Sequence, residues 1–385
     1  MNYTFQHQQL SQLFSLEKET IRIPESDMQI QNLEFNSDFR IDESQFTSQT
    51  SDYFGEDSQI AENWNFRYPV FIPSEKKNNK AIILLHGLNE RDWTKYLAWA
   101  KYLTEKTCRS VILFPLAFHM NRGKKEWSDP RVMNSLANSR KSSFKNIVQI
   151  SFANAALSNR LTEDPMRFYR AGLQSAQDLI QLMSQIKNGN HPLFEKNTHI
   201  NFMGYSIGAF LTQILFIANP NKIFRGSNAA LFCGGSTFNH MSGASKLIMD
   251  NLAYENLNNF YLNQFGRNLY TETKSHLSNQ LQSVVHAFKA MIPIPAFSRL
   301  KEKRFSKLSK RIIAIGLLKD HVIPAKEIME TLKDKKGKVK FRFQMLDFPY
   351  HYSHENPFPV FSNEKGMQVD KSFELVFSQL ASGLK

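Results

Sequence analysis

The sequence contains few cysteines and no long apolar run. Cys108 and Cys233 are the only two cysteines among 385 residues, and both lie in apolar segments. We therefore expect buried, reduced thiols and exclude a fold that depends on disulfides. No stretch approaches the roughly 18 consecutive apolar residues that a membrane-spanning helix needs. Residues 1–7 also lack a basic segment followed by an apolar run, so we expect a cytoplasmic protein.

Motifs for metals, nucleotides and repeat architectures are missing too. The sequence has no His-Glu-x-x-His arrangement and no pair of cysteines with the spacing of metal ligands. It also lacks a Gly-rich phosphate cradle and a dinucleotide fingerprint. We therefore expect no metal and no cofactor. Neither an internal repeat nor a low-complexity tract is present, which excludes a solenoid.

Negative charge is in short supply. The chain has 48 Lys and Arg against 35 Asp and Glu, a formal net charge of +13. Much of the surplus falls in residues 299–311 and in a second cluster made of Lys333, Lys335, Lys336, Lys338 and Lys340. No nucleic-acid-binding signature accompanies them, so we expect a solvated face and no nucleic-acid partner. Peripheral contact with an anionic membrane is the less favoured interpretation.

The pattern of apolar residues changes near residue 80. The first 64 residues are polar and irregular, and we expect them to form an N-terminal arm with edge strands, one of them at 30–35; a further β-like patch follows at 65–72. Strands and helices then alternate, with predicted strands at 81–85, 111–114, 199–204, 228–233, 311–317 and 338–348 and helices at 94–107, 165–186, 207–217 and 372–380. This alternation predicts an α/β fold with a mostly parallel, doubly wound sheet.

Two long intervals interrupt the alternation. Residues 118–163 follow the second strand of this run, and residues 237–308, with helical patterns at 244–252 and 277–291, separate the fourth strand from the fifth. We assign 65–236 and 309–385 to one core, with 118–163 as an insertion. Residues 237–308 are predicted to form a helical cap or lid over the carboxyl ends of the strands.

The segment Gly204-Tyr205-Ser206-Ile207-Gly208 lies between an apolar strand and an apolar helix. Gly-x-Ser-x-Gly in that context is typical of a nucleophile elbow, in which the strand turns sharply into the helix and holds the serine in a strained conformation. Small residues on either side let the neighbouring elements approach. The pattern predicts Ser206 as a nucleophile. An ordinary glycine-flanked turn is the simpler structural alternative.

Acyl transfer also needs N–H donors that face the developing oxyanion. The candidates are the N–H of Ile207, at the start of a helix, and the N–H of Leu88, in the loop after an earlier strand. We expect His86 to brace that loop by hydrogen bonding. A surface ion pair is the simpler role for Arg91. The predicted substrate-binding residues are Asn89, Arg91 and Tyr205, and we expect Asn89 and Arg91 at the pocket rim.

Three segments together, 83–87, 204–208 and 316–324, resemble the α/β-hydrolase superfamily of serine esterases and lipases. The resemblance covers roughly residues 65–385 outside the two insertions and suits an uncharacterised bacterial family within that superfamily. It implies a triad in the chain order Ser, Asp or Glu, His. The acid is then Asp320, because no carboxylate follows the preceding strand before Asp250. An Asp that caps the helix starting near Pro324 is the alternative.

The base must come from a histidine that follows Asp320. His321 is adjacent to the acid and its side chain points away from the required meeting point. His351 and His354 lie past the last predicted strand, where a loop reaches back over the serine. We favour His354, because its distance beyond the strand lets the loop fold back, and keep His351 as the alternative base.

These residues predict a serine hydrolase that cleaves a carboxylic ester, or a thioester or amide, of a small-molecule substrate. The aromatic residues Phe260, Tyr261 and Phe265 of the predicted cap are candidates for an acyl pocket or for the core of the cap. A second hypothesis is a catalytically inactive hydrolase-like binding module. In that case its basic cap docks on an anionic lipid surface or a protein partner.

Overall fold

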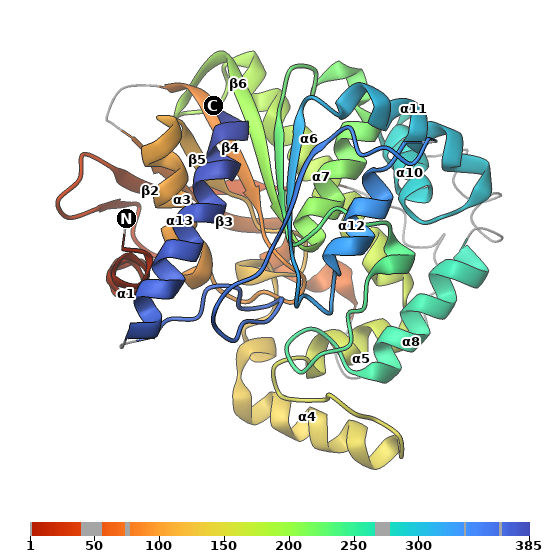
Figure 1. The fold of residues 1–385 in the computed structure, drawn as a ribbon. Helices are drawn as coiled ribbons and strands as arrows, with labels where there is room; N and C mark the ends of the chain where they lie inside the picture. Colours follow the sequence, from red (N-terminus) through yellow and green to blue (C-terminus); the bar gives the residue numbers. More distant parts are fainter. Residues whose placement is uncertain (1, 40–55, 74–77, 266–277, 335, 362–363) are drawn as a thin grey trace.

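A single nine-stranded sheet organises the computed structural model, which describes residues 2–39, 56–73, 78–265, 278–334, 336–361 and 364–385 (Figure 1). The strand order is β1-β2-β3-β5-β4-β6-β7-β8-β9. Pairing is antiparallel from β1 to β3 and between β3 and β5, and parallel across the rest. The strands are β1 (Thr20–Arg22), β2 (Gln29–Asn36), β3 (Asn65–Ile72), β4 (Asn78–Leu85), β5 (Ser110–Leu113), β6 (Phe194–Tyr205), β7 (Ala229–Phe232), β8 (Ile312–Leu317) and β9 (Arg342–Leu346).

Helices cover both faces of this sheet, because alternate strand residues point to opposite sides. Ile82 and Leu84 of β4 pack with the helices of one face, and Ile83 and Leu85 with those of the other. The first face carries α1 (Tyr3–Leu13), α3 (Thr94–Thr107) and α13 (Glu364–Leu384). The second carries α6 (Met166–Asn188), α7 (Ile207–Ala218), α10 (Asn279–Met291), α11 (Ser298–Leu308) and α12 (Ala325–Leu332). The predicted α/β fold, mostly parallel and doubly wound, is confirmed.

The carboxyl ends of the parallel strands lie along one edge of the sheet. Three further helices lie at that edge (Figure 1). These are α4 (Pro130–Ser143) and α5 (Ala155–Glu163) from the first insertion and α8 (Asn251–Asn259) from the second. A small apolar core around Met133, Leu136 and Ile150 holds the first insertion together. The remaining short elements are α2 (Ala61–Trp64), the 3-10 turns Asp57–Gln59, Met120–Arg122, Lys125–Ser128, Pro220–Lys222, Phe238–His240 and Pro295–Phe297, and a π-helical turn Phe260–Gln264.

A buried ion pair joins the two insertions. The Arg140 guanidinium on α4 donates through Nε and Nη2 to Asp250 Oδ2, over 3.1 and 2.7 Å. Asp250 Oδ1 accepts from the N–H of Ala253 and so caps α8. Because α8 begins there, the predicted helix at 244–252 is wrong: most of that segment is an irregular loop. Asp250 ends the loop because its carboxylate satisfies a helix N-terminus.

The predicted cap at 237–308 is divided in the structure. Only its first part, with α8, lies near the carboxyl ends of the strands (Figure 1). α10 and α11 instead pack against α7 on a face of the sheet. The reason is visible in α10, whose apolar stripe with Val284, Phe288 and Met291 is buried in the main core. Residue 277, the first of the predicted helix, lies outside the described residues.

The cysteines differ from each other. Cys233 is buried, as predicted, but Cys108 is exposed, because it forms the left-handed C-cap that ends α3 at φ 53°. Neither forms a disulfide in the structure. Within the described ranges, none of the helices has the length and apolar character to cross a bilayer.

Candidate active site

Ser206 stands at the sharp turn between β6 and α7. Its backbone has φ 55° and ψ −121°, a conformation that non-glycine residues rarely adopt. The flanking glycines are sterically required. A Cβ on Gly204 would lie 2.6 Å from the Ala209 nitrogen, and one on Gly208 would collide with the Leu85 carbonyl oxygen. Strain of this kind clusters at functional sites, where the surrounding structure holds it.

A chain of two hydrogen bonds connects Ser206 to an acid. Ser206 Oγ lies 2.7 Å from His354 Nε2, and His354 Nδ1 lies 2.7 Å from Asp320 Oδ2. All three residues are buried, at 4%, 4% and 2% exposure. An ionised carboxylate only accepts, so Nδ1 carries the proton and the neutral ring offers the Nε2 lone pair to the serine hydroxyl. The structure thus brings together the nucleophile, the acid and the favoured base of the sequence-based hypothesis.

Asp320 lies in the turn that follows β8. Its Oδ1 accepts from the N–H groups of Val322 and Ile323, at 2.9 and 2.8 Å, while Oδ2 faces His354. The Asp320 carboxylate therefore has two roles: Oδ1 stabilises the turn, and Oδ2 orients the His354 imidazole. The other two histidines of the hypothesis, His321 and His351, are exposed.

Tyr205 supports the loop that carries His354, which we call the histidine loop. Its hydroxyl donates to the His354 carbonyl oxygen, and its ring stacks on the imidazole with centroids 5.6 Å apart and planes 17° from parallel. The side chain is 1% exposed, and burial raises the pKa of the Tyr205 hydroxyl well above its usual value. We predicted a substrate contact for Tyr205, but its side chain is buried behind His354 and its hydroxyl bonds the backbone.

A polar network not predicted from the sequence ties this histidine loop to the loop after β4. Lys95 Nζ donates to the Glu355 carbonyl oxygen at 2.7 Å and to the Glu90 carboxylate. The Tyr96 hydroxyl donates to the same carboxylate at 2.9 Å and accepts from the Gly87 N–H at 3.0 Å. These residues belong to no spacing motif. Only the contacts between distant loops reveal them.

His86 fixes the loop that holds the predicted oxyanion donor. Its Nδ1 donates to the Gly87 carbonyl oxygen at 2.8 Å, and its Nε2 accepts from the Leu116 N–H at 2.9 Å. Burial and the adjacent His119 hold the pKa of His86 well below its usual value, so the ring stays neutral. The predicted bracing role is confirmed. Leu88 follows in this loop, and Ile207 opens α7, where helix N–H groups lack intrahelical acceptors.

Asn89 and Arg91 hold the insertions in place. Asn89 Nδ2 donates to the carbonyl oxygens of Ala153 and Leu247, at 2.8 and 2.7 Å. The Arg91 guanidinium donates to the carbonyl oxygens of Phe152 and Ala153. We predicted that these side chains contact the substrate. In the structure their N–H groups instead bond backbone carbonyl oxygens, because two loops from the insertions cover this rim. Both residues still line an open polar cleft of about 770 Å³, its mouth included, together with Leu88, Lys95 and Glu355.

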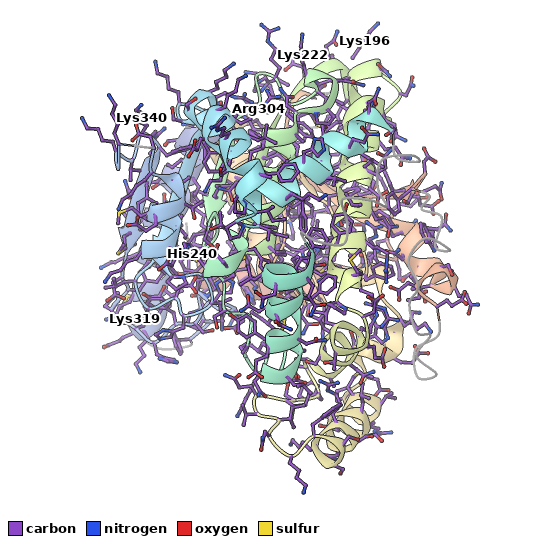
Figure 2. All side chains as sticks on the ribbon, turned by 90° about the vertical axis from the view of Figure 1, so that its right-hand side faces the viewer. Lys196, Lys222, His240, Arg304, Lys319 and Lys340 are labelled. Atoms are coloured by element: carbon purple, nitrogen blue, oxygen red, sulfur yellow. The ribbon has the colours of Figure 1, made fainter. Side chains whose placement is uncertain are left out.

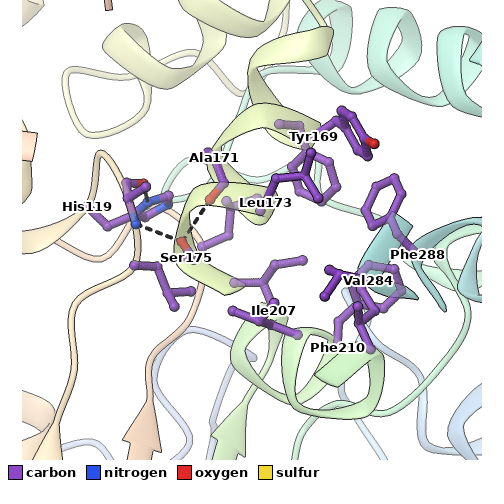
Figure 3. A pocket seen from close by; sticks show the side chains of 16 residues that line it. His119, Tyr169, Ala171, Leu173, Ser175, Ile207, Phe210, Val284 and Phe288 are labelled. Carbon is purple, nitrogen blue, oxygen red and sulfur yellow. Dashed lines mark hydrogen bonds between the residues drawn. The ribbon is translucent and has the colours of Figure 1, made fainter. Parts of the chain in front are cut away.

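An apolar cavity of about 570 Å³, its mouth included, opens between α6, α7 and α10 (Figure 3). Leu88 and Ile207 line it, so it adjoins both predicted oxyanion donors. Its aromatic wall consists of Phe168, Tyr169, Phe210 and Phe288. Phe260, Tyr261 and Phe265 are absent from this lining. Tyr261 is instead buried, with its hydroxyl donating to the Pro165 carbonyl oxygen, so its part of the segment is core.

The basic clusters meet at a groove between α11 and the segment after α12. The groove encloses about 1220 Å³, its mouth included, and its cations are Arg299, Lys301, Lys303, Lys333, Lys336 and Lys340. Arg304 and Lys340 lie in the upper part of Figure 2. Lys340 pairs with Asp334 at 2.9 Å. Lys335, a member of the second cluster, lies outside the described residues.

Comparison with protein families gives one match, which spans the chain. The model of a family described as "Family of unknown function (DUF6051)" matches residues 1–385. The chain belongs to this family. No curated protein matches it.

Solved structures offer likenesses of fold. One is a cold-adapted esterase from an Arctic intertidal metagenomic library, at 11% identity and TM-score 0.39, covering 97% of this chain and 100% of that one. The hyperthermophilic esterase of the archaeon Pyrobaculum calidifontis has 11% identity and TM-score 0.46, covering 98% and 90%. Carboxyl esterase 2 of the fungus Tuber melanosporum has 10% identity and TM-score 0.44, covering 100% and 99%. Such distant likenesses assign no reaction to this chain.

Proposed function

We propose that this protein is a serine hydrolase that cleaves carboxylic esters through an acyl-enzyme, with Ser206, His354 and Asp320 as its catalytic residues. One observation carries the proposal: two 2.7 Å hydrogen bonds run in series from a strained, buried serine to a buried carboxylate. A glycine-flanked turn of purely structural use needs neither the imidazole nor the acid. Groups in this order are the working parts of acyl transfer.

In the proposed mechanism Ser206 Oγ attacks the ester carbonyl carbon while His354 Nε2 takes the hydroxyl proton. Asp320 stabilises the imidazolium, and the N–H groups of Leu88 and Ile207 hold the oxyanion. His354 returns the proton to the alkoxide, which leaves as the alcohol. A water molecule then attacks the acyl-enzyme by the same steps, with His354 as base, and releases the carboxylic acid and the serine.

Leu88 lines both the apolar cavity and the open polar cleft. We infer that the acyl part of a substrate lies in one of these spaces and the alcohol part in the other. The apolar cavity adjoins the oxyanion donors and suits the acyl group. The open polar cleft, lined by Lys95 and Glu355, suits the leaving alcohol. We infer an ester with an apolar acyl part and a polar alcohol part, because each part then replaces water with a surface of its own polarity.

The test is labelling with a fluorophosphonate probe, followed by ester hydrolysis. The wild type should be labelled, and Ser206→Ala should lose both labelling and turnover. His354→Ala should lower kcat by roughly 10⁴-fold or more. His351→Ala is the matched control, an exposed histidine three positions away, and should keep most of the activity.

Two results would overturn this proposal. One is a folded wild type that resists the probe under conditions that label a known serine hydrolase. The other is labelling that survives Ser206→Ala. The second hypothesis, a catalytically inactive binding module, would then be tested by measuring flotation of the protein with anionic liposomes at varied salt.

A further inference from the structure

His119 lies in the segment after β5, and its hydrogen bonding fixes its tautomer. Its Nδ1 lies 2.8 Å from the Ala117 carbonyl oxygen. A carbonyl oxygen only accepts, so Nδ1 must carry the proton. In the neutral ring Nε2 then has a lone pair and no hydrogen, which makes it an acceptor. Burial lowers the pKa of His119 to about 4, so the neutral form prevails at physiological pH.

The Nε2 of His119 is buried, and no group in the described part of the chain donates to it. The neighbouring His86, whose ring centroid lies 5.4 Å away, shows the contrast, since both its nitrogens are paired. Buried polar atoms are nearly always satisfied, and an exception calls for an explanation such as a missing ligand.

The place of His119 supplies that explanation. His119 lies between two spaces. On one side it lines the apolar cavity beside Leu88 and Ile207, within a wall otherwise made almost entirely of apolar side chains (Figure 3), and on the other it lines a smaller polar space with Arg160. Ser175, the hydroxyl closest to it in the view, is fully engaged: it donates to the Ala171 carbonyl oxygen and accepts from the Ala117 N–H. The hydroxyl of Tyr169 also lacks a partner among the residues that the structure describes, but it lies on the opposite side of the view from His119.

We propose that His119 Nε2 is a specificity-determining acceptor, and that the cavity binds acyl groups carrying a hydroxyl on an otherwise apolar chain or ring. The inference rests on the proposed function, since it takes the cavity as the acyl site. A donor on the acyl group gains the hydrogen bond that the wall leaves open. A carboxylate in the same place meets a lone pair and is rejected, because it has no proton to donate.

The test compares methyl esters of phenylalkanoic acids of increasing chain length, each with hydrogen, hydroxyl or methoxy at the para position. The methoxy group keeps the oxygen of the hydroxyl but replaces its donor hydrogen with a methyl group, so the loss of the preference in His119→Phe separates the effect of the donor from that of the added bulk. At the length that reaches Nε2, wild type should favour hydroxyl over methoxy by about fivefold in kcat/KM, the worth of one neutral hydrogen bond. His119→Phe should bring that ratio to about 1, and His351→Phe, the same substitution at an exposed histidine outside the cavity wall, should leave it unchanged.

The outcomes separate the two proposals. Ser206-dependent hydrolysis of the unsubstituted esters without a hydroxyl preference at any length overturns the role of His119 and leaves the hydrolase proposal standing. A preference that persists in His119→Phe overturns it as well. If no ester is hydrolysed, both proposals fall together. Should His119→Phe not fold, the wild-type ratio of hydroxyl to hydrogen decides, because a buried hydroxyl without an acceptor lowers kcat/KM and one with an acceptor does not.

Discussion

Gly172 offers a sharp test of the acyl cavity, because stability and activity should respond in opposite directions. The residue lies inside α6, where glycine is unfavourable, and it lines the cavity. A Cβ built on it meets nothing within 4 Å. Its absent side chain is therefore what keeps that part of the cavity open, at a cost to the helix of about 1 kcal/mol relative to alanine.

The expected magnitudes follow from burial and helix propensity. Gly172→Ala should raise the free energy of unfolding by about 1 kcal/mol. Gly172→Leu should also stabilise α6 but fill the cavity with four carbon atoms. Each buried methylene of an acyl chain contributes about 0.8 kcal/mol, roughly a fourfold gain in kcat/KM. With space for about three methylenes lost, the longest accepted ester should be hydrolysed roughly 60-fold more slowly.

The assay pairs urea denaturation with kcat/KM for esters of increasing acyl length. Gly226→Ala is the matched control, since a Cβ there also meets nothing within 4 Å, but the backbone has φ 91°. That variant should lose about 1 kcal/mol of stability and keep the length profile. If Gly172→Leu leaves the profile of the wild type intact, the cavity is not the acyl site and the reasoning is refuted.

Three other perturbations have distinct signatures. Tyr205→Phe removes the hydroxyl that holds the His354 carbonyl, so kcat should fall about tenfold while KM changes little, as steady-state kinetics would reveal. Arg140→Ala leaves Asp250 buried without its partner and should cost about 3–5 kcal/mol in urea denaturation; an unchanged midpoint would contradict the buried pair. The pKa of His119 is lowered to about 4 in the folded protein, whereas its value in the unfolded chain is near 6.5. The stability that depends on a neutral His119 is therefore fully present only above pH 6.5. Stability should therefore fall as the pH drops from 6.5 to 4, by up to about 1.4 kcal/mol per pH unit from this residue, and His119→Phe should flatten that slope.

The sheet was predictable because its strands are continuous apolar runs. All five residues from Ala81 to Leu85 are fully buried, and such runs leave little choice of structure. The chain order of the triad was equally visible, because each of its members follows a strand end. The choice between His351 and His354 was open in the sequence, since it depends on how a loop folds back over Ser206.

The roles of rim residues and the limits of the cap could not be predicted. Tyr205 and Arg91 face backbone carbonyls of loops far away in the sequence, and no local pattern encodes the direction of a side chain. The division of 237–308 also depends on contacts between residues far apart in the sequence, because α10 packs against α7 in the main core. One local signal was present: Asp129-Pro130 caps and opens α4, with the Asp129 carboxylate accepting from the Arg131 N–H.

The pairing of Arg140 with Asp250 makes the two insertions depend on each other. The two partners come from insertions that follow β5 and β7, strands separated in the sheet by β4 and β6, and each insertion supplies one charge of the buried pair. Deleting one leaves a charge of the other stranded in a low-dielectric interior. The two insertions therefore form a single structural unit encoded by two separate segments of the sequence. A chimaera that grafts them onto a bare scaffold must transplant both.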